Sequence, residues 1–393
     1  MLPRMRTLSR RRAATAAASV ALLGAAGGLG LVRAAAGARQ PSGRGAASTA
    51  AATGGRNASS SAETTSIGQQ PGTEAPAGDP PRVASIHRFP VKSCGGEQVA
   101  AVQCRRLQPL PGDRRYMWVD AEHKFITQRP REPRQGNGGL GVPAMATIHA
   151  SYQPNGALRL AAPPHPQYFG LEPLELPPPP PPTKLSVAIR RMTCTLFSGE
   201  AKVTEEHASA GQWFSTFSGV GGVQLVRSDE SATTLGDDWR ESRTAFQSAA
   251  FPGEEASARE IPLDDGGTIL LVSSAALEEL NAKLTEKSMP TVSMERFRPN
   301  FVVEGVAAHA EDDWLELQLG EVRFRVERPC TRCSTVLVDQ ASGKPDDVNW
   351  LSKVLARYRL SRADPKYGGF DGQGTKFGVY ITPLNSVCTN GLF

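Results

Sequence analysis

The chain has 393 residues, enough for one or two domains, and a formal net charge of +5. Residues 1–62 hold nine arginines and no acidic residue, which leaves 35 basic against 39 acidic residues elsewhere. A nucleic-acid-binding protein carries its basic face on the folded part, so this charge balance excludes nucleic acid as the expected partner. The six cysteines are too sparse for a secreted disulfide scaffold, and the six histidines form no HxH or HExxH metal pattern.

The amino terminus has the composition of a leader. Residues 13–32 are uncharged and rich in alanine and glycine, and an arginine cluster precedes them. As a helix, a run of this length would span a bilayer core of about 30 Å. Arginine, serine and alanine without acidic residues favour a membrane anchor or a cleaved organelle presequence over a secretory signal. We therefore assign residues 1–33 to a leader or membrane anchor, and residues 34–81, which have hardly any large apolar side chain, to a disordered linker.

Order is predicted to begin at Arg82 with an alternating apolar pattern typical of a strand. Further short strand patterns, separated by Gly, Pro and Asn turns, predict antiparallel pairing. They are YMWVD (116–120), FITQR (125–129), ATIHASY (146–152) and ALRLAA (157–162). The proline run at 177–182 breaks the pattern, either as a polyproline II loop or as a ligand for a partner domain.

The second half of the chain mixes strands with a few helices. A short amphipathic helix is predicted over 208–217, followed by a polar loop over about 227–258. Residues 268–284 read as a buried strand that turns into a helix capped by Ser273 or Ser274. A hairpin over 314–326, a helix over 348–358 and a strand over 377–383 complete the elements. The class is therefore β-dominated α+β, and the chain has no glycine-rich nucleotide-binding motif of the GxGxxG or GxxxxGK[ST] type.

The stretch RPCTRCSTV (328–336) contains the one close cysteine pair, Cys330 and Cys333. A zinc site would need two more ligands, and a thioredoxin-like site would place the pair at a helix start in a βαβ unit. Two buried thiols that only pack are the third alternative. The flanking arginines favour the thiolate, the form that binds metal, because positive charge lowers the pKa of a thiol.

Three separate segments carry residues suited to binding an anion. Lysine, arginine, serine and exposed backbone N–H groups are what a phosphate-bearing cofactor needs. The segments are PVKSCGG (90–96), GDRRYMWV (112–119) and ERFRPNFVV (295–303). Each of them alone is equally compatible with an ordinary surface loop.

Five short motifs in order carry a resemblance: PVKSC, FRPN, AEDDW, PCTRC and FGVY. Together they resemble the MOSC-domain family, in particular the mitochondrial amidoxime reducing components, and they are similar to the carboxyl-terminal part of molybdenum cofactor sulfurase. The resemblance covers residues 82–383. The sulfurase's large pyridoxal-phosphate domain has no counterpart, because too few residues precede PVKSC.

The resemblance implies roles for individual residues. Cys333 stands where the family has its molybdenum ligand, and Cys330 is then a neighbouring packing thiol. The remaining ligands would come from the dithiolene of a molybdopterin and from oxo groups. Asp265 lies near the family's substrate side, where it would orient a substrate N–OH or relay a proton; a plain turn aspartate is the alternative. The implied pterin and phosphate contacts are Lys92, Ser93, Arg115, Arg298, Asn300, Thr331, Arg332 and Tyr380.

The implied architecture is a β-rich MOSC N-terminal domain over 82–215 packed against a MOSC β-barrel domain over 216–393. The implied enzyme reduces N-hydroxylated compounds such as amidoximes, hydroxylamines and N-hydroxylated bases, with nitrite as a further substrate. Electrons would come from cytochrome b5 and its NADH-dependent reductase. The implied location is mitochondrial, anchored in the outer membrane, or another organelle after leader cleavage. A molybdenum cofactor carrier or sulfurase-like module without turnover is the alternative, and a CxxC redox or zinc protein is a third interpretation.

Overall fold

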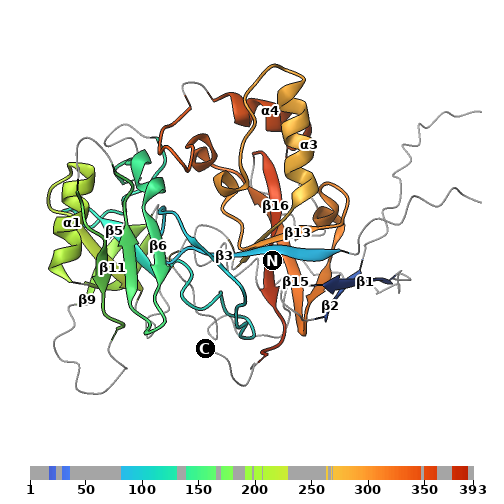
Figure 1. Cartoon of the computed structure of the whole chain (residues 1–393), viewed down its shortest axis with the longest axis horizontal. Coiled ribbons are helices and arrows are strands. Elements are labelled where there is room, and N and C mark those ends of the chain that lie inside the picture. Colours follow the sequence, from blue (N-terminus) through green and yellow to red (C-terminus); the bar gives the residue numbers. More distant parts are fainter. Residues whose placement is uncertain are drawn as a thin grey trace, which may run out of the picture.

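The protein forms two β-rich lobes in a computed structural model (Figure 1). The β-dominated α+β class predicted from the sequence is confirmed. The structure describes residues 17–23, 29–35, 81–130, 139–164, 170–179, 191–196, 199–205, 207–228, 263, 267, 269–346, 349–360 and 374–387.

The first lobe contains a four-stranded antiparallel sheet in the order β5-β11-β10-β9 and a three-stranded sheet in the order β6-β7-β8. The bounds are β5 (Tyr116–Val119), η1 (Pro143–Thr147), β6 (His149–Tyr152), β7 (Leu158–Ala161), β8 (Leu174–Leu176), β9 (Arg191–Leu196), β10 (Gly199–Glu205), α1 (Ala208–Ser218) and β11 (Gln224–Ser228). The segment 125–129, predicted to be a strand, forms only isolated bridges. Its residues nevertheless stay extended beside β5, since Ile126 N–H donates to the carbonyl of Trp118 (2.7 Å).

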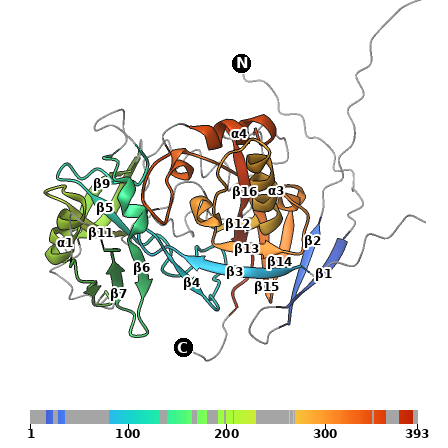
Figure 2. The same cartoon turned by 45° about the horizontal axis from the view of Figure 1, so that its top comes forward.

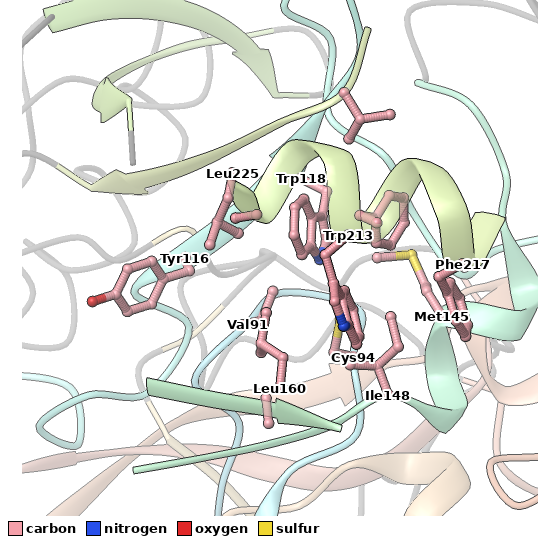
Figure 3. Packing of buried hydrophobic residues seen from close by; sticks show 14 of the residues in the cluster. Val91, Cys94, Tyr116, Trp118, Met145, Ile148, Leu160, Trp213, Phe217 and Leu225 are labelled. Carbon is pink, nitrogen blue, oxygen red and sulfur yellow. The ribbon is translucent and has the colours of Figure 1, made fainter. Parts of the chain in front are cut away.

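The core of the first lobe explains why 208–217 folds as a helix. Ala210, Trp213, Phe214 and Phe217 recur at helical spacing, and all four are buried against the sheets. Phe214 stacks on Trp118 of β5 with ring centroids 4.3 Å apart. Figure 3 shows Trp118 and Trp213 reaching into the same cluster as Cys94, which belongs to the segment between β3 and β4.

The second lobe is built on a seven-stranded sheet in the order β14-β15-β16-β12-β13-β3-β4. Its strands are β3 (Arg82–Arg88), β4 (Glu97–Val99), β12 (Ile269–Ser273), β13 (Phe301–Glu304), β14 (Glu316–Leu319), β15 (Val322–Thr331) and β16 (Lys376–Pro383). Its helices are α3 (Ser274–Thr285), η3 (Met294–Phe297), η4 (Ala310–Asp313), η5 (Ser334–Leu337) and α4 (Trp350–Tyr358). Figures 1 and 2 show α3 and α4 on the same side of this sheet.

Alternating side chains of β12 serve two cores. Ile269 and Leu271 face one apolar cluster, and Leu270 and Val272 face the cluster that α3 and α4 cover. The sequence predicted no pairing direction for this strand, and the structure pairs β12 with β13 in parallel. The reason is α3, which returns the chain to the other end of the sheet as a crossover helix. Ser273 occupies the expected cap position, but its hydroxyl accepts the N–H of His309 instead of a helix amide.

The two lobes do not divide the chain at one point. The boundary predicted at residues 215–216 falls inside α1, and β11 beyond it pairs with β5 of the first sheet. In the other direction, β3 and β4 belong by pairing to the sheet of the second lobe. Figure 2 shows β3 running beside β13 while the chain that follows enters the first lobe.

The predicted leader has strands where a helix was expected. Ala17–Leu23 (β1) and Leu29–Ala35 (β2) form an antiparallel pair, and β2 lies near the edge strand β14. Among the described residues, no helix has both the length and the apolar character needed to cross a bilayer. Residues 34 and 35 of the linker predicted over 34–81 belong to β2. Residues 36–80 of that linker, prolines 180–182 and residues 229–258 of the polar loop lie outside the described residues.

His309 generates a prediction about stability and pH. Its imidazole packs edge-on against Phe377 (5.7 Å between centroids), and neither ring nitrogen has a hydrogen-bond partner among the described atoms. Burial, followed by the charge of Arg359, lowers the pKa of His309 from 6.5 to about 4. The unfolded chain therefore binds more protons between these values, and stability falls as the pH drops from 6.5 toward 4. Asparagine tolerates the left-handed backbone at this position (φ 61°). In His309→Asn, the free energy of unfolding should therefore fall by about 2 kcal/mol less on acidification than in wild type.

Urea unfolding at pH 7 and at pH 4.5 measures this effect. His123→Asn is the matched control, because His123 also has a positive φ (58°). An equal flattening of the pH dependence in both variants would contradict the role given to His309.

Candidate active site

Cys333 lies just after β15 at the position that begins η5. It is exposed, whereas the other described cysteines (Cys94, Cys104, Cys194 and Cys330) are buried. Surrounding protein nevertheless desolvates the thiol, which acts to raise its pKa. The hairpin β14–β15 therefore delivers one exposed cysteine to the start of η5.

Two residues outside the cysteine motif hold the Cys333 sulfur. Thr335 Oγ1 lies 3.2 Å from the sulfur, and Arg129 Nε lies 3.4 Å from the same hydroxyl. Because the hydroxyl accepts from Arg129, its own hydrogen can point to the sulfur. Desolvation raises the pKa of Cys333, but Arg129, Thr335 and Arg332 outweigh it and bring the pKa down to about 7. A large fraction of this thiol is therefore thiolate near neutral pH.

Cys330 has a different environment. It is buried, and Arg332 Nη1 donates to its sulfur at 2.8 Å. Tyr380 of β16 hydrogen-bonds the same sulfur, and burial raises the pKa of the Tyr380 phenol. Gly267 passes so close to this ring that a Cβ there would lie 2.1 Å from it, so a side chain at 267 would displace Tyr380. Cys330 is thus a packed thiol that positions Arg332 and Tyr380.

The Lys92–Ser93 segment is anchored by its neighbour Cys94. The Cys94 thiol is fully buried in the first core, and burial raises its pKa to about 12, so it serves packing rather than metal binding. Lys92 is buried with its ammonium 5.9 Å from the centroid of the Phe125 ring. Ser93 has a left-handed backbone (φ 65°), and its hydroxyl lies 3.5 Å from that of Thr127.

Arg298 joins this segment to the second lobe. Its Nη1 donates to the Cys94 carbonyl, and its guanidinium lies 4.3 Å from the centroid of the Phe89 ring. Burial, then repulsion by Arg114, lowers the pKa of Arg298 to about 9. Its Nη2 and the Nε of Arg332 are buried without a hydrogen-bond partner among the described atoms. Buried cationic donors left unpaired favour an anionic group between them.

Asn300 is engaged within the protein. Its side chain donates to the carbonyl of His87 (3.1 Å) and accepts the N–H of Leu270 (3.1 Å), so it ties β3 to β12. Arg114 Nη1 also reaches its oxygen at 3.3 Å and pairs with Asp113. Arg115 is buried next to Arg114, but Arg114 makes the contacts to the Arg298 segment.

Contacts connect some of the predicted residues: Arg298 binds the Cys94 carbonyl beside Ser93, and Arg332 binds the Cys330 sulfur and acts on the pKa of Cys333. Asp265 lies outside the described residues. Thr331 is half-buried at the end of β15, opposite Lys376 in the sheet. Sequence reasoning missed Arg129, Thr335 and Thr127; the available signal for two of them was a run of polar residues closing the apolar segment 125–129. No group of three or more His, Cys, Asp or Glu side chains gathers for a metal among the described residues.

The Cys333 environment predicts a reactivity profile for cofactor-free protein. The rate of iodoacetamide alkylation at Cys333 should rise with pH around a midpoint near 7. Arg129→Gln should raise that midpoint by about one unit, because it removes the nearest compensating charge. Peptide mass spectrometry assigns the modified cysteine, and the exposed-face variant Arg159→Gln is the control. An unchanged midpoint in Arg129→Gln would show that its charge does not reach the sulfur.

Comparisons with known proteins agree with this arrangement. Residues 80–220 match the MOSC N-terminal beta barrel domain, and residues 258–387 match the MOSC domain. The chain is 30% identical over 304 residues to Mitochondrial amidoxime reducing component 2 of Rattus norvegicus, which covers 76% of this chain and 78% of that protein. It is 28% identical over 307 residues to Mitochondrial amidoxime-reducing component 1 of Mus musculus, covering 77% and 78% respectively.

A more distant relative is Molybdenum cofactor sulfurase 2 of Culex quinquefasciatus. It is 24% identical over 274 residues, which is 67% of this chain but 31% of that protein. The two domain matches fall on the lobes that carry Lys92, Arg298 and Cys333. The chain therefore belongs to the MOSC-domain family, together with the mitochondrial amidoxime reducing components.

Proposed function

We propose that this protein is a molybdenum-cofactor-dependent reductase of N-hydroxylated compounds, with Cys333 as the protein ligand of the metal. The single observation that carries the proposal is the exposed Cys333 sulfur, held toward its thiolate form beside buried arginine atoms that lack partners. A soft thiolate suits molybdenum, and the unpaired arginine donors suit the anionic part of a pterin cofactor. The names of the relatives, amidoxime reducing components, support the reaction class.

Each residue in the proposed site has a defined task. Cys333 would hold the metal, and Lys92, Ser93, Arg298, Thr331 and Arg332 would hold the pterin and its phosphate. Tyr380 and Cys330 keep Arg332 in place from the second lobe, and Thr335 with Arg129 orients the Cys333 sulfur. Arg115 and Asn300 are proposed to support the pterin-binding residues indirectly, by stabilising the segments in which they lie. When bound, the cofactor supplies the two electrons that cleave the N–O bond.

The protein's own contribution is access, positioning and proton supply. The exposure of Cys333 leaves one side open to a small substrate such as an amidoxime, a hydroxylamine, an N-hydroxylated base or nitrite. Asp265 is proposed to orient the substrate N–OH or to deliver the proton that leaves with water. Because the sequence has no flavin or nicotinamide motif, we propose cytochrome b5 and its NADH-dependent reductase as the electron donors. The arginine-rich leader and the relatives' names support a mitochondrial location, with outer-membrane attachment as part of the proposal.

Cys333→Ser tests the metal assignment. With cytochrome b5, its reductase and NADH, we expect the rate of benzamidoxime consumption to fall more than about 100-fold. Substituting residues that only support metal ligands already lowers metal affinity or activity about 10–100-fold. Circular dichroism should show an unchanged fold, because the Cys333 side chain is exposed. Cys194→Ala, which alters a thiol in the core of the first lobe, is the control and should retain turnover. Full turnover in Cys333→Ser would refute the assignment, and no turnover in molybdenum-loaded wild type would favour a cofactor carrier.

Arg298→Met tests the cofactor-binding assignment separately from turnover. Loss of a charge-assisted hydrogen bond to the cofactor's anionic group should weaken retention about tenfold or more. Elemental analysis after identical purification should then show less molybdenum per protein than in wild type. Arg325→Met, which removes an arginine on β15 paired with Glu316, is the matched control and should keep its molybdenum. Equal molybdenum in Arg298→Met and wild type would remove Arg298 from the site.

A further inference from the structure

Cys333 lies between two attachments of its own segment to η3. On the amino-terminal side, Arg332 Nη2 donates to the carbonyl of Phe297 at 2.8 Å. On the carboxyl-terminal side, Arg296 Nη1 donates to the carbonyl of Val336 at 3.2 Å. One arginine therefore reaches from the cysteine motif to η3, and the other reaches from η3 to η5. The backbone around the exposed cysteine is thus held on both sides against the same short helix.

The second of these arginines, Arg296, is buried and meets two carboxylates. Its ion pair with Asp346 has two contacts, Nη1 to Oδ2 at 2.8 Å and Nη2 to Oδ1 at 3.2 Å. Asp339 Oδ2 lies 3.5 Å from Nη2. A planar guanidinium can bind a carboxylate with two N–H groups and still donate to a backbone carbonyl, whereas a lysine ammonium is a single point charge. The shape of the side chain at 296, and not its charge alone, therefore decides these contacts.

Both carboxylates lie on the loop that follows η5, residues 338–346, which we call the η5 loop. The N–H of Asp339 donates to the carbonyl of Lys344 at 2.9 Å. The N–H of Asp346 donates to the carbonyl of Leu337 at 2.7 Å, so the η5 loop closes on itself. The arginine therefore holds a preformed loop and not two independent side chains.

The η5 loop also contacts the first lobe. Gln340 Nε2 donates to Oε1 of Gln128 at 2.8 Å, and Gln128 directly precedes Arg129. Gly343 is buried with a φ of 66°, and a Cβ there would lie 2.8 Å from the Cα of Ala144 in η1. The loop therefore packs closely on η1. It also holds the residue before the arginine that contacts the hydroxyl beside the Cys333 sulfur.

We propose that Arg296 is a positioning residue for Cys333. Through η5 and the η5 loop it fixes the two groups beside the sulfur, Thr335 of the second lobe and Arg129 of the first. Since η3 leads directly into Arg298, the same residue also sets the spacing between the exposed cysteine and that buried guanidinium. The geometric role holds whatever the reaction is, and only its consequence for molybdenum binding rests on the proposed function.

A nitroxide spin label on the exposed Cys333 tests this role in cofactor-free protein. All proteins carry Cys388→Ser, and the other four cysteines are buried. Arg296→Lys keeps the charge but loses the planar fork, and Asp346→Asn keeps the shape but loses the counter-charge. In both, the rotational correlation time of the label should shorten at least about twofold, because the start of η5 gains motion on the nanosecond scale. Asp346→Asn removes no bulk, so it decides the question alone if Arg296→Lys fails to fold.

Two controls separate positioning from a general loss of stability. Arg325→Lys makes the same exchange at an arginine of β15 that pairs with Glu316. Val203→Ala opens a cavity in a core of the first lobe. Both should leave the label spectrum unchanged, even where urea unfolding shows Val203→Ala to be as unstable as Arg296→Lys. An unchanged spectrum in a folded Arg296→Lys or Asp346→Asn protein, or an equal change in Val203→Ala, would overturn the proposal.

Molybdenum content separates this proposal from the proposed function. If Cys333 binds the metal, Arg296→Lys should retain about tenfold less molybdenum per protein than wild type, as expected for a residue that orients a metal ligand. A more mobile label together with a wild type that never binds molybdenum would support the positioning role and contradict the proposed function. An unchanged label with molybdenum bound in wild type would overturn the positioning role and leave the proposed function intact.

Discussion

The hydrogen bond from the Arg298 guanidinium to the Cys94 carbonyl connects the two cores on which the site depends. Cys94 is fixed by the first core, where its thiol is fully buried among Trp118, Trp213 and Ile148. Arg298 is fixed by the second lobe, since it follows η3 in a left-handed conformation (φ 55°) and precedes the Asn300 clamp. Separating the two groups would cost free energy, because a buried guanidinium and a buried carbonyl would each lose a hydrogen-bond partner. The segments predicted to bind an anion are therefore held in place by packing on both sides.

The same dependence on two lobes governs the reactive sulfur. Cys333 and Thr335 belong to the second lobe, but the charge that most lowers the Cys333 pKa belongs to Arg129, which follows the extended segment beside β5. Desolvation alone would keep this thiol protonated. The lobes must pack together for Arg129 to lower the pKa of this thiol, so a thiolate near neutral pH depends on the assembled fold. This gives a physical reason for the single chain to pass between the lobes at β3 and β11 rather than form two separable domains.

The sequence predicted those elements whose formation depends on residues that are close together in the chain. The hairpin β14–β15 followed from alternation around Gly320, and the β12–α3 unit followed from a buried run that changes period to a leucine stripe. Cys333 was singled out through the resemblance of PCTRC to the family motif, and the arginines beside the cysteine pair favoured a thiolate. Arg129 was not, because it is about two hundred positions away and reaches Cys333 only through tertiary packing. The parallel pairing of β12 with β13 was also missed, since period-two alternation does not record strand direction.

Asn300 belongs to a motif that the sequence singled out, but its side chain bonds the protein backbone. Its side chain already bonds the backbone of β3 and β12 and meets Arg114, which leaves little capacity for a ligand. The physical consequence is indirect: the amide fixes the start of β13, which begins three residues after Arg298, and so fixes the direction of that guanidinium. Pro299 between them lines a pocket of about 300 Å³ that also contacts Phe89 and Ala146. The three consecutive residues therefore face three surroundings, with Arg298 toward Cys94, Pro299 toward the pocket and Asn300 toward the sheet. A role for this segment in the proposed site therefore needs no direct ligand contact from each of its members.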